Sequence, residues 1–319
     1  MKRFAAALVL CLATCAFAQD YPTKPIRLVI PYAAGSVAEV LFRVLAPSVE
    51  AKLGQRFIVD ARPGADGNIG MAEAARATPD GYTLVLAPTA NFAVMGHLAK
   101  DLPFDAVSSF EPVSMIAETW PLCTVGPNVP ARTMKELADY IRANPGKYNY
   151  GSQGTGSPTH LIGAAFSQLN GNSMVHIPYK GTPPMITALL SGDIQVTFAS
   201  MTAVLPQLKA GKLRAIAVMG RERQPELPDL PTTVEAGFPQ LVMSNWWVIA
   251  APKGTPARAV ERLSGEFRAG LKDADVRKRY DEVGHIPVGM TPAETAAFIK
   301  SESARYKGIV EAGNIRLDR

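Results

Sequence analysis

The stretch IRLVIPYAAGSVAEVLFRVLAPSVEAKLG, residues 26–54, decides the fold. Its apolar run over 26–30 predicts a strand, the small residues over 31–36 predict a loop, and the pattern over 37–53 predicts a helix. Gly54 stands where a left-handed residue usually ends a helix. A strand, a loop and a helix in this order form the repeating unit of α/β sheets, in which crossover helices join mainly parallel strands.

The same unit recurs along the chain. A strand over 57–59, a helix over 68–77 and a strand over 83–87 complete a first module. A second module follows, with expected strands over 122–125, 148–151, 174–177, 194–198 and 213–218 and helices that open near residues 133, 158, 183 and 203. An irregular connection over 221–240 leads to a strand over 247–251, after which we expect helices alone.

The length of 319 residues suits about two domains at roughly 150 residues each. We place a signal segment at 1–18, a first domain at 19–121 plus 248–319, and a second domain at 122–247. The first domain is discontinuous because the helical tail is expected to return to it. Two chain segments then connect the domains.

The first residues have the three parts of a secretory signal peptide. A basic start at 1–3 precedes an apolar run over 4–13, and the Ala-Phe-Ala of 16–18 is a cleavage site. We therefore expect export to the periplasm. The alternative is a lipoprotein site whose Cys15 carries lipid.

Composition excludes two classes of partner. Lys and Arg total 33 against 28 Asp and Glu, a formal +5. Removing the signal segment leaves 31 basic against 28 acidic residues, or +3, which does not predict nucleic-acid binding. No later apolar run approaches the ~18 to 20 residues of a membrane span, so we expect a soluble mature protein. We also expect a monomer. Its single cysteine, Cys123, allows no intrachain disulfide.

Three glycine-rich loops are the best candidates for a binding site. They span 31–36, 62–70 and 151–158, and each follows an expected strand and precedes an expected helix. A helix N-terminus has free N–H groups and a partial positive charge, so small residues there let an anion approach closely. The alternative is that the glycines serve turn geometry alone.

The third loop does not match a nucleotide motif. Gly151 and Gly156 have P-loop spacing, but Ser157-Pro158 stands where Lys and Ser or Thr are required. A dinucleotide fingerprint fails as well, because Thr159 replaces its third glycine. The uncharged loop instead suits a carboxylate, and we expect no cofactor.

A search for catalytic groups gives no complete set. No G-x-S-x-G elbow occurs, and His97, His160, His176 and His285 form no metal-binding pair at helical spacing. Cys123 has no evident base partner and reads as a buried thiol. His160, one turn into the helix after the third loop, either faces a ligand or packs. We expect neither a catalytic residue nor a metal site.

Together these motifs resemble one family. They are residues 31–35, 62–64 with 67–70, 79–83, 150–152 with 156–160, and 178–181. The chain is similar over its mature length to the solute-binding receptors of tripartite tricarboxylate transporters, the Bug-type receptors. The resemblance implies a type II periplasmic-binding-protein fold of two α/β domains. A hinge closes them on a small carboxylated solute, which is delivered to a membrane permease.

The resemblance also implies the ligand contacts. In the family the ligand lies between the domains, and its carboxylate is held by loop backbone groups and hydroxyls. The positions that correspond here are Tyr32, Ala33, Ala34, Gly35, Ser36, Val37, Gly67, Asn68, Pro88, Thr89, Ala90 and Asn91 in the first domain, and Ser152, Thr155, Gly156, Ser157, Pro158, Thr159, His160, Tyr179 and Lys180 in the second. Lys180 has the alternative of a solvated cation at a strand end.

The sequence departs from the family pattern in two loops. The first loop usually continues Gly-Gly-Gly-Thr-Asp, whereas residues 35–39 read Gly-Ser-Val-Ala-Glu. The loop after Phe198 often has an acid that can pair with a ligand ammonium, but Ala199-Ser200 stands here. This absence argues against an amino-acid ligand, unless Glu39 or Asp193 substitutes.

Aromatic residues near the loops favour a bulkier ligand. Tyr32, Val37, Phe92 and the Trp246-Trp247 pair could line an apolar pocket, which suits an aromatic carboxylate. Core packing is the alternative for the tryptophans. We therefore expect a binding protein without catalytic turnover that captures a di- or tricarboxylate or an aromatic carboxylate. A secreted hydrolase-type enzyme and a receptor that feeds a membrane sensor remain alternatives.

Overall fold

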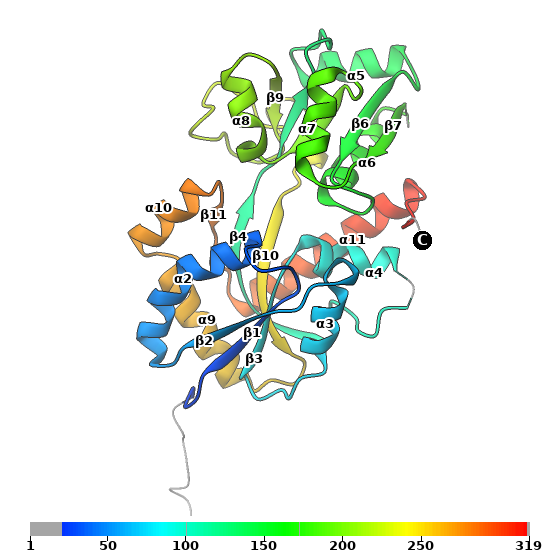
Figure 1. Ribbon diagram of the computed structural model, residues 1–319. Coiled ribbons are helices and arrows are strands. Elements are labelled where there is room, and N and C mark those ends of the chain that lie inside the picture. Colours follow the sequence, from blue (N-terminus) through cyan, green and yellow to red (C-terminus); the bar gives the residue numbers. More distant parts are fainter. Residues whose placement is uncertain (1–20, 100, 172, 318–319) are drawn as a thin grey trace, which may run out of the picture.

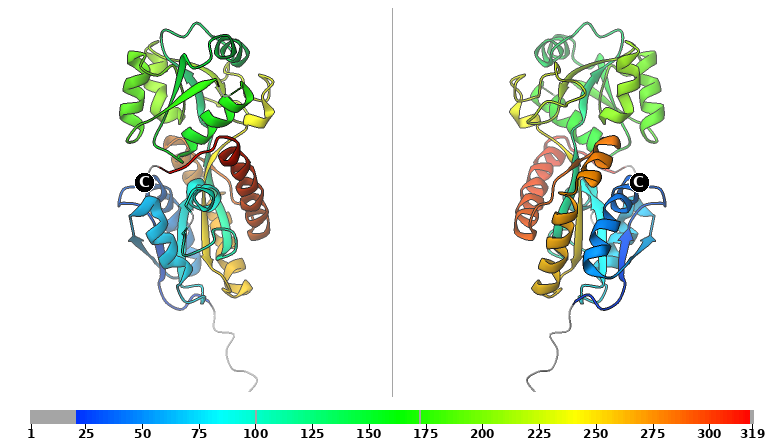
Figure 2. Two further views of the ribbon diagram at one scale, coloured as in Figure 1. Left: turned by 90° about the vertical axis from the view of Figure 1, so that its right-hand side faces the viewer. Right: turned by 90° about the vertical axis from the view of Figure 1, so that its left-hand side faces the viewer.

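The computed structural model describes residues 21–99, 101–171 and 173–317. The predicted signal segment and Cys15 lie outside these residues. The molecule has two lobes, one above the other in Figure 1, and each is built on one sheet with helices on both sides. The side views in Figure 2 show the lobes stacked along the long axis of the molecule. Among the described helices, none has the length and apolar character that a membrane crossing needs.

The larger sheet has the strand order β11-β4-β10-β3-β1-β2. Its strands are β1 (Ile26–Ile30), β2 (Phe57–Ala61), β3 (Thr83–Pro88), β4 (Phe110–Thr119), β10 (Asn245–Pro252) and β11 (Ile286–Pro287). Strand β1 runs parallel to β2 and β3, whereas β10 runs antiparallel to β3 and β4. Because side chains alternate along each strand, Leu28 and Val29 enter different core clusters on opposite faces.

Helices cover both faces of this sheet. One cluster joins it to α2 (Val37–Leu53), α9 (Ala257–Gly270) and α10 (Ala274–Glu282). The other joins it to α3 (Asn68–Ala75), α4 (Met95–Leu98), η3 (Ala90–Val94) and α11 (Pro292–Ala312). The chain after β10 therefore packs on the first sheet, as α9 lies against α2 and β4.

The smaller sheet has the order β7-β6-β8-β5-β9. Its strands are β5 (Leu122–Val125), β6 (Tyr148–Ser152), β7 (Met174–Pro178), β8 (Val196–Ala199) and β9 (Arg214–Val218). The helices around it are α5 (Met134–Ala143), α6 (Pro158–Leu169), α7 (Thr182–Ser191) and α8 (Met201–Lys209). Two single turns lie in loops: η2 (Ala65–Gly67), between β2 and α3, and η4 (Pro239–Leu241), between β9 and β10. Strand β6 pairs in parallel with β7 and β8, whereas β5 is antiparallel to both its neighbours.

The strand prediction is wrong in three respects. Both sheets are mixed rather than mainly parallel, because β5 and β10 run against their neighbours. The ten-residue β4 was not expected, since its sequence FEPVSMIAET interrupts the apolar pattern with a proline and two glutamates. A further strand, β11, follows β10, although its two residues carry no strand pattern of their own.

The chain crosses between the sheets twice. The first crossing, Trp120-Pro121, joins β4 to β5, and the second lies between β9 and β10. The predicted domain boundaries at 121/122 and 247/248 stay predictions, although β10 already begins at Asn245. A pair of crossings is the arrangement that lets two lobes rotate about a hinge.

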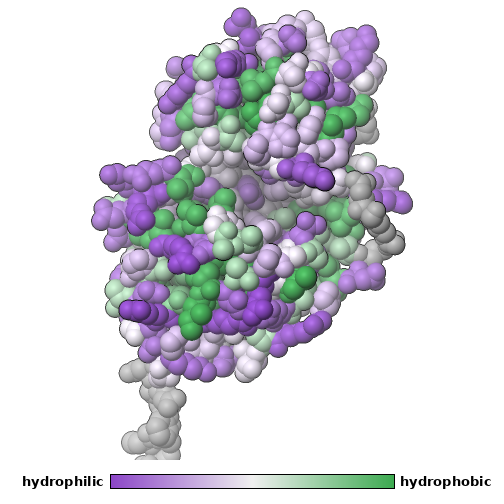
Figure 3. All heavy atoms as spheres, in the orientation of Figure 1, coloured by the Kyte–Doolittle hydropathy of each residue, from purple (hydrophilic) through white to green (hydrophobic). Residues whose placement is uncertain are grey.

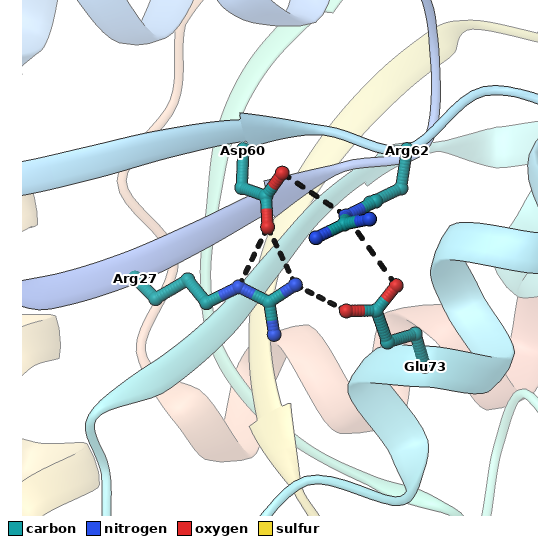
Figure 4. Close-up of polar contacts among 4 residues, drawn as sticks. All are labelled: Arg27, Asp60, Arg62 and Glu73. Carbon is teal, nitrogen blue, oxygen red and sulfur yellow. Dashed lines mark hydrogen bonds and ion pairs between the residues drawn. The ribbon is translucent and has the colours of Figure 1, made fainter.

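An ionic network fixes the ends of the second glycine-rich loop (Figure 4). Arg27 of β1 donates to Asp60 of β2 from Nε at 2.8 Å and also binds Glu73 of α3. Arg62 binds the same two carboxylates, at 3.0 Å to Asp60 and 3.5 Å to Glu73. Burial alone would raise the pKa of Asp60, but hydrogen bonds from Arg27 and Arg62 lower it overall. The network ties the residues before the loop to the helix after it.

Candidate functional site

A cleft of about 390 Å³ lies between the two lobes. The space-filling view in Figure 3 shows the molecule hollowed at this level. Residues from both lobes line it: Tyr32, Ser36, Val37, Ala38, Asp66, Pro88, Ala90, Met95, Asn245 and Trp247 from the first, and Gln153, Gly154, Thr155, Gly156, Ser157 and Pro158 from the second. Nine of the predicted ligand residues are among them, namely Tyr32, Ser36, Val37, Pro88, Ala90, Thr155, Gly156, Ser157 and Pro158.

The N-terminus of α2 opens into this cleft. Ser36 occupies the N-cap position in an extended conformation, but its side chain makes no capping hydrogen bond. Its Oγ is buried and has no partner among the described residues. The first N–H groups of any α-helix lack intrahelical acceptors, so those of Val37 and Ala38 are available to a ligand. A buried hydroxyl and a helix N-terminus together favour binding of an anion.

Glu39 orders the loop before α2. Its carboxylate accepts hydrogen bonds from the Gly35 N–H at 2.9 Å and from Arg43 Nε at 2.6 Å. The Gly35 N–H and the Arg43 guanidinium hold the pKa of Glu39 below its usual value, against the effect of burial. Glu39 does not line the cleft in the described structure, so it positions the loop rather than facing the ligand.

Two predicted contacts, Asn91 and Thr89, are fully buried behind the cleft wall. Asn91 accepts from the Tyr32 hydroxyl at 2.6 Å, and its Nδ2 donates to the Asp66 carbonyl at 3.0 Å. Thr89 Oγ1 accepts from the Trp246 N–H at 2.9 Å. These residues therefore hold the first two loops and β10 in place, and they do not line the cleft in the described chain.

The second loop turns sharply at Gly67. This residue has φ 88°, in the left-handed region that favours glycine. A Cβ there would lie 2.9 Å from Asn91 Nδ2 and 3.3 Å from Pro31 Cβ, so the loops pack too closely for a side chain. Gly67 is buried and Asn68 is partly buried, and neither lines the cleft. Ala33, Ala34 and Gly35 of the first loop are exposed but are also outside the lining.

The third loop satisfies most of its own donors. The N–H of Gln153 donates to Thr159 Oγ1 at 3.0 Å, that of Gly154 to Ser152 Oγ at 3.1 Å, and that of Gly156 to His160 Nδ1 at 3.0 Å. Ser152 and Thr159 are buried and lie outside the cleft lining. The expectation that these backbone groups face an anion therefore needs correction, because side chains of the same loop and helix already bind them.

Ser157 caps α6 rather than presenting a free hydroxyl. Its Oγ accepts from the His160 N–H at 3.3 Å and donates to the Gly154 carbonyl at 2.6 Å. Ser157 still lines the cleft, but its hydroxyl is committed to the helix start. The N-terminus of α6 is thus capped, whereas that of α2 is open.

His160 faces away from the cleft. It lines a separate cavity of about 530 Å³ with Tyr150, His176 and the residues after α11. Its ring stacks on that of His176, with centroids 3.7 Å apart and planes at 3°. Burial and the neighbouring His176 lower the pKa of His160 to about 3, so its Nδ1 remains an acceptor for the Gly156 N–H. His160 therefore supports the third loop from the side opposite the cleft, through its bond to Gly156.

Two other predicted contacts lie outside the cleft lining. Tyr179 is partly buried and its N–H donates to the Ser152 carbonyl at 3.0 Å, whereas Lys180 is exposed. Neither belongs to the described residues that line the cleft. Tyr179 thereby supports the third loop through the backbone.

Several lining residues were not among the predicted contacts. Asp66, Gln153 and Gly154 belong to the glycine-rich loops, so loop position alone could have included them. Ala38, Met95 and Asn245 carry no such signal, because their approach to the cleft depends on how the lobes are placed. Asn245 begins β10, and its buried Oδ1 has no partner.

The tryptophan pair has divided roles. Trp246 is fully buried in the core shared by α11 and η3, with Phe92 at 6.4 Å and Phe298 at 5.3 Å between ring centroids. Trp247 points to the other face of the sheet, where it lines the cleft and lies 4.7 Å from the His285 ring. Among the described residues, no group of three or more His, Cys, Asp or Glu could hold a metal ion.

Glu118 lies where β4 approaches the crossing. It pairs with Trp246 of β10 and with Ile286 of β11, and its carboxyl bonds Ser244. Burial raises the pKa of Glu118 to about 6, and the nearby Glu222 and Glu302 act in the same direction. A largely buried carboxyl beside the crossing makes the stability of this region depend on pH.

We expect the wild-type protein to lose stability, relative to Glu118→Gln, as the pH rises from 4.5 through 6. The folded state binds the proton more tightly than the unfolded state, so this contribution is complete below pH 4.5 and is lost above the folded pKa. Glutamine mimics the protonated carboxyl and does not titrate. Urea unfolding of both proteins across this range measures the difference, and a difference independent of pH would contradict the expectation.

Comparison with known proteins extends over most of the chain. The family model described as "Tripartite tricarboxylate transporter family receptor" matches residues 41–315. The protein BugT of Bordetella pertussis (strain Tohama I) is 32% identical over 323 residues, which cover 99% of this chain and 99% of BugT. The family model begins after the first glycine-rich loop and covers the second and third.

Solved structures show the same fold. A periplasmic transporter is 40% identical with a TM-score of 0.77, covering 93% of this chain and 100% of its own. Rpa4515 of R. palustris with adipate is 30% identical with a TM-score of 0.77, at the same coverage. MatC (Rpa3494) of Rhodopseudomonas palustris with bound malate is 27% identical with a TM-score of 0.73, covering 91% and 100%. The predicted two-domain fold of type II periplasmic binding proteins is confirmed.

Proposed function

Because the chain belongs to the tripartite tricarboxylate transporter receptor family, a family of periplasmic solute-binding receptors, we propose that it captures a small organic carboxylate between its lobes. The observation that carries this proposal is the open N-terminus of α2, where Ser36 Oγ is buried in the cleft without a partner. A carboxylate oxygen would accept from that hydroxyl and from the N–H groups of Val37 and Ala38.

Domain closure completes the site. The loop from Gln153 to Pro158 lies across the cleft from α2, on the other lobe. A ligand that contacts both lobes is bound better in the closed state, so it shifts the population toward closure. The receptors with adipate and malate support a carboxylate as the ligand class.

Delivery to a membrane permease is the second part of the proposal. It rests on the family description, which names a transporter receptor. The signal segment proposed for residues 1–18 would bring the chain to the periplasm, where such a permease is accessible. The closed lobes would present one surface to the permease when a ligand is bound.

A thermal-shift screen tests carboxylate capture. The protein is unfolded and refolded first, which removes any ligand that co-purifies. Mono-, di- and tricarboxylates, aromatic carboxylates and amino acids are then added singly. A ligand at ~100 times its dissociation constant adds about 2.7 kcal/mol to the free energy of unfolding, so at least one should raise the melting temperature. If no carboxylate does so, the proposed function is wrong.

A further inference from the structure

One side chain sets the charge of the cleft. Asp66 is the only Asp, Glu, Lys, Arg or His among the described residues that line it. An anion must therefore be held there by neutral donors, with a negative charge in the same cleft. That combination disfavours a ligand with several carboxylates, because each additional one meets the Asp66 charge without a cation to offset it.

The backbone holds Asp66 at this place. Asp66 has φ 53° and ψ 35°, a left-handed conformation that is uncommon for residues other than glycine and that Asp tolerates better than most. Its carbonyl accepts from Nδ2 of the fully buried Asn91 at 3.0 Å. Asn91 in turn accepts from the Tyr32 hydroxyl. The position of Asp66 is thus set by its own backbone, and its side chain is free for another contact.

The Asp66 carboxylate is available to a ligand. It has no hydrogen bond or ion pair with a side chain in the described part of the molecule. Its charge nevertheless reaches into the cleft, since the pKa of Tyr32 is raised by burial and, second, by Asp66. A second acceptor lines the same cleft, the buried and unpartnered Oδ1 of Asn245. Both oxygens suit a group that donates hydrogen bonds.

The two other acids considered from the sequence do not serve this purpose. Glu39 is occupied by Gly35 and Arg43 outside the cleft lining. Asp193 is exposed, accepts from Ser191 Oγ at 2.7 Å and is likewise outside the lining. Among these acids Asp66 alone lines the cleft, so it is the candidate to pair with a ligand ammonium in place of the acid that is absent after Phe198.

We propose that the cleft selects monocarboxylates that also carry a protonated amino group, and that Asp66 is the residue that determines this preference. The inference rests on the proposed function, because it assumes that the ligand carboxylate binds at α2. The ammonium group pairs with the Asp66 carboxylate, and a bound zwitterion adds no net charge to the cleft. A dicarboxylate of the same length would place its second anion beside Asp66 instead.

Matched ligand series test this preference by isothermal titration calorimetry on the refolded, ligand-free protein. Each series holds an acid, its diacid and its amino acid at one chain length: butanoate, succinate and 4-aminobutanoate; hexanoate, adipate and 6-aminohexanoate; with L-amino acids as a further set. The wild-type protein should bind an amino member at least tenfold more tightly than its diacid. Asp66→Asn should lower that affinity at least tenfold and raise the affinity for the diacid. Asp193→Asn, the same change outside the cleft, should alter neither.

The outcomes separate this inference from the proposed function. If a diacid binds the wild-type protein more tightly than every amino member, Asp66 does not select an ammonium, although carboxylate capture stands. Equal weakening of all three members by Asp66→Asn would overturn the inference in the same way. If no member binds but another carboxylate raises the melting temperature in the thermal-shift screen, the inference fails and carboxylate capture stands. If no carboxylate does so there either, both fail. The wild-type preference is decisive even if Asp66→Asn does not fold.

Discussion

Replacing Trp246 by alanine is expected to lower the free energy of unfolding by about 3–5 kcal/mol, the cost of removing a large buried aromatic side chain. Trp246 has no exposed surface and contacts the rings of Phe92 and Phe298. The backbone N–H of Trp246 donates to Thr89 Oγ1, and alanine keeps this bond, so the expected loss comes from the side chain. The cavity left by alanine would lie where the second crossing enters the larger sheet.

Urea unfolding followed by far-UV circular dichroism measures this loss. Trp246→Phe is the matched control, because it keeps an aromatic ring in contact with Phe92 and Phe298 and should cost less than alanine. A loss below about 1 kcal/mol for Trp246→Ala would show that the site collapses around the smaller side chain, and would remove Trp246 as a principal core residue.

The tryptophan pair also shows which features of the site can be predicted from the sequence. Adjacent residues of a strand point to opposite faces, so 246 and 247 had to enter different environments once a strand was predicted there. Which of them met the cleft depended on which face of β10 turns toward the second lobe. That is a property of the strand order β3-β10-β4, and no pattern near residue 247 encodes it.

The glycine-rich loops were predicted in the right places for a similar reason. Small residues between a strand and a helix are a local signal, and all three loops follow their strands as expected. The contacts within them are not local. Ser36 and Ser157 both precede a helix in the sequence, yet Ser157 caps its helix and Ser36 does not. Ser157 Oγ accepts from the His160 N–H, whereas Ser36 makes no corresponding capping bond.

The antiparallel strands were harder to predict. Strand β4 contains Glu111, Pro112 and Glu118, and its pairing with β10 shifts register at two points. Such a strand loses the alternation by which strands are recognised. Strand β11 has only two residues and owes its pairing to β4. Both strands are stabilised by neighbours that are distant in sequence, so the pattern of their own residues does not predict a strand.

Replacing Ser36 by alanine should weaken carboxylate binding by about 1–3 kcal/mol, or roughly 5- to 150-fold in the dissociation constant. The Ser36 hydroxyl is buried in the cleft without a partner and would donate to the ligand carboxylate. In the unliganded protein it makes no hydrogen bond, so its removal should leave the free energy of unfolding unchanged or slightly higher. Calorimetric titration with the tightest carboxylate from the thermal-shift screen measures the first effect, and urea unfolding measures the second.

Ser157→Ala is the matched control, since it removes the same hydroxyl from the N-terminus of the facing helix α6. That hydroxyl accepts from the His160 N–H and donates to the Gly154 carbonyl, so its loss should lower the free energy of unfolding by about 0.5–2 kcal/mol. The two serines should thus give opposite patterns, with affinity lost at Ser36 and stability lost at Ser157. An unchanged affinity for Ser36→Ala would exclude its hydroxyl as a ligand contact. Destabilisation by that same change would instead make Ser36 a structural cap of α2.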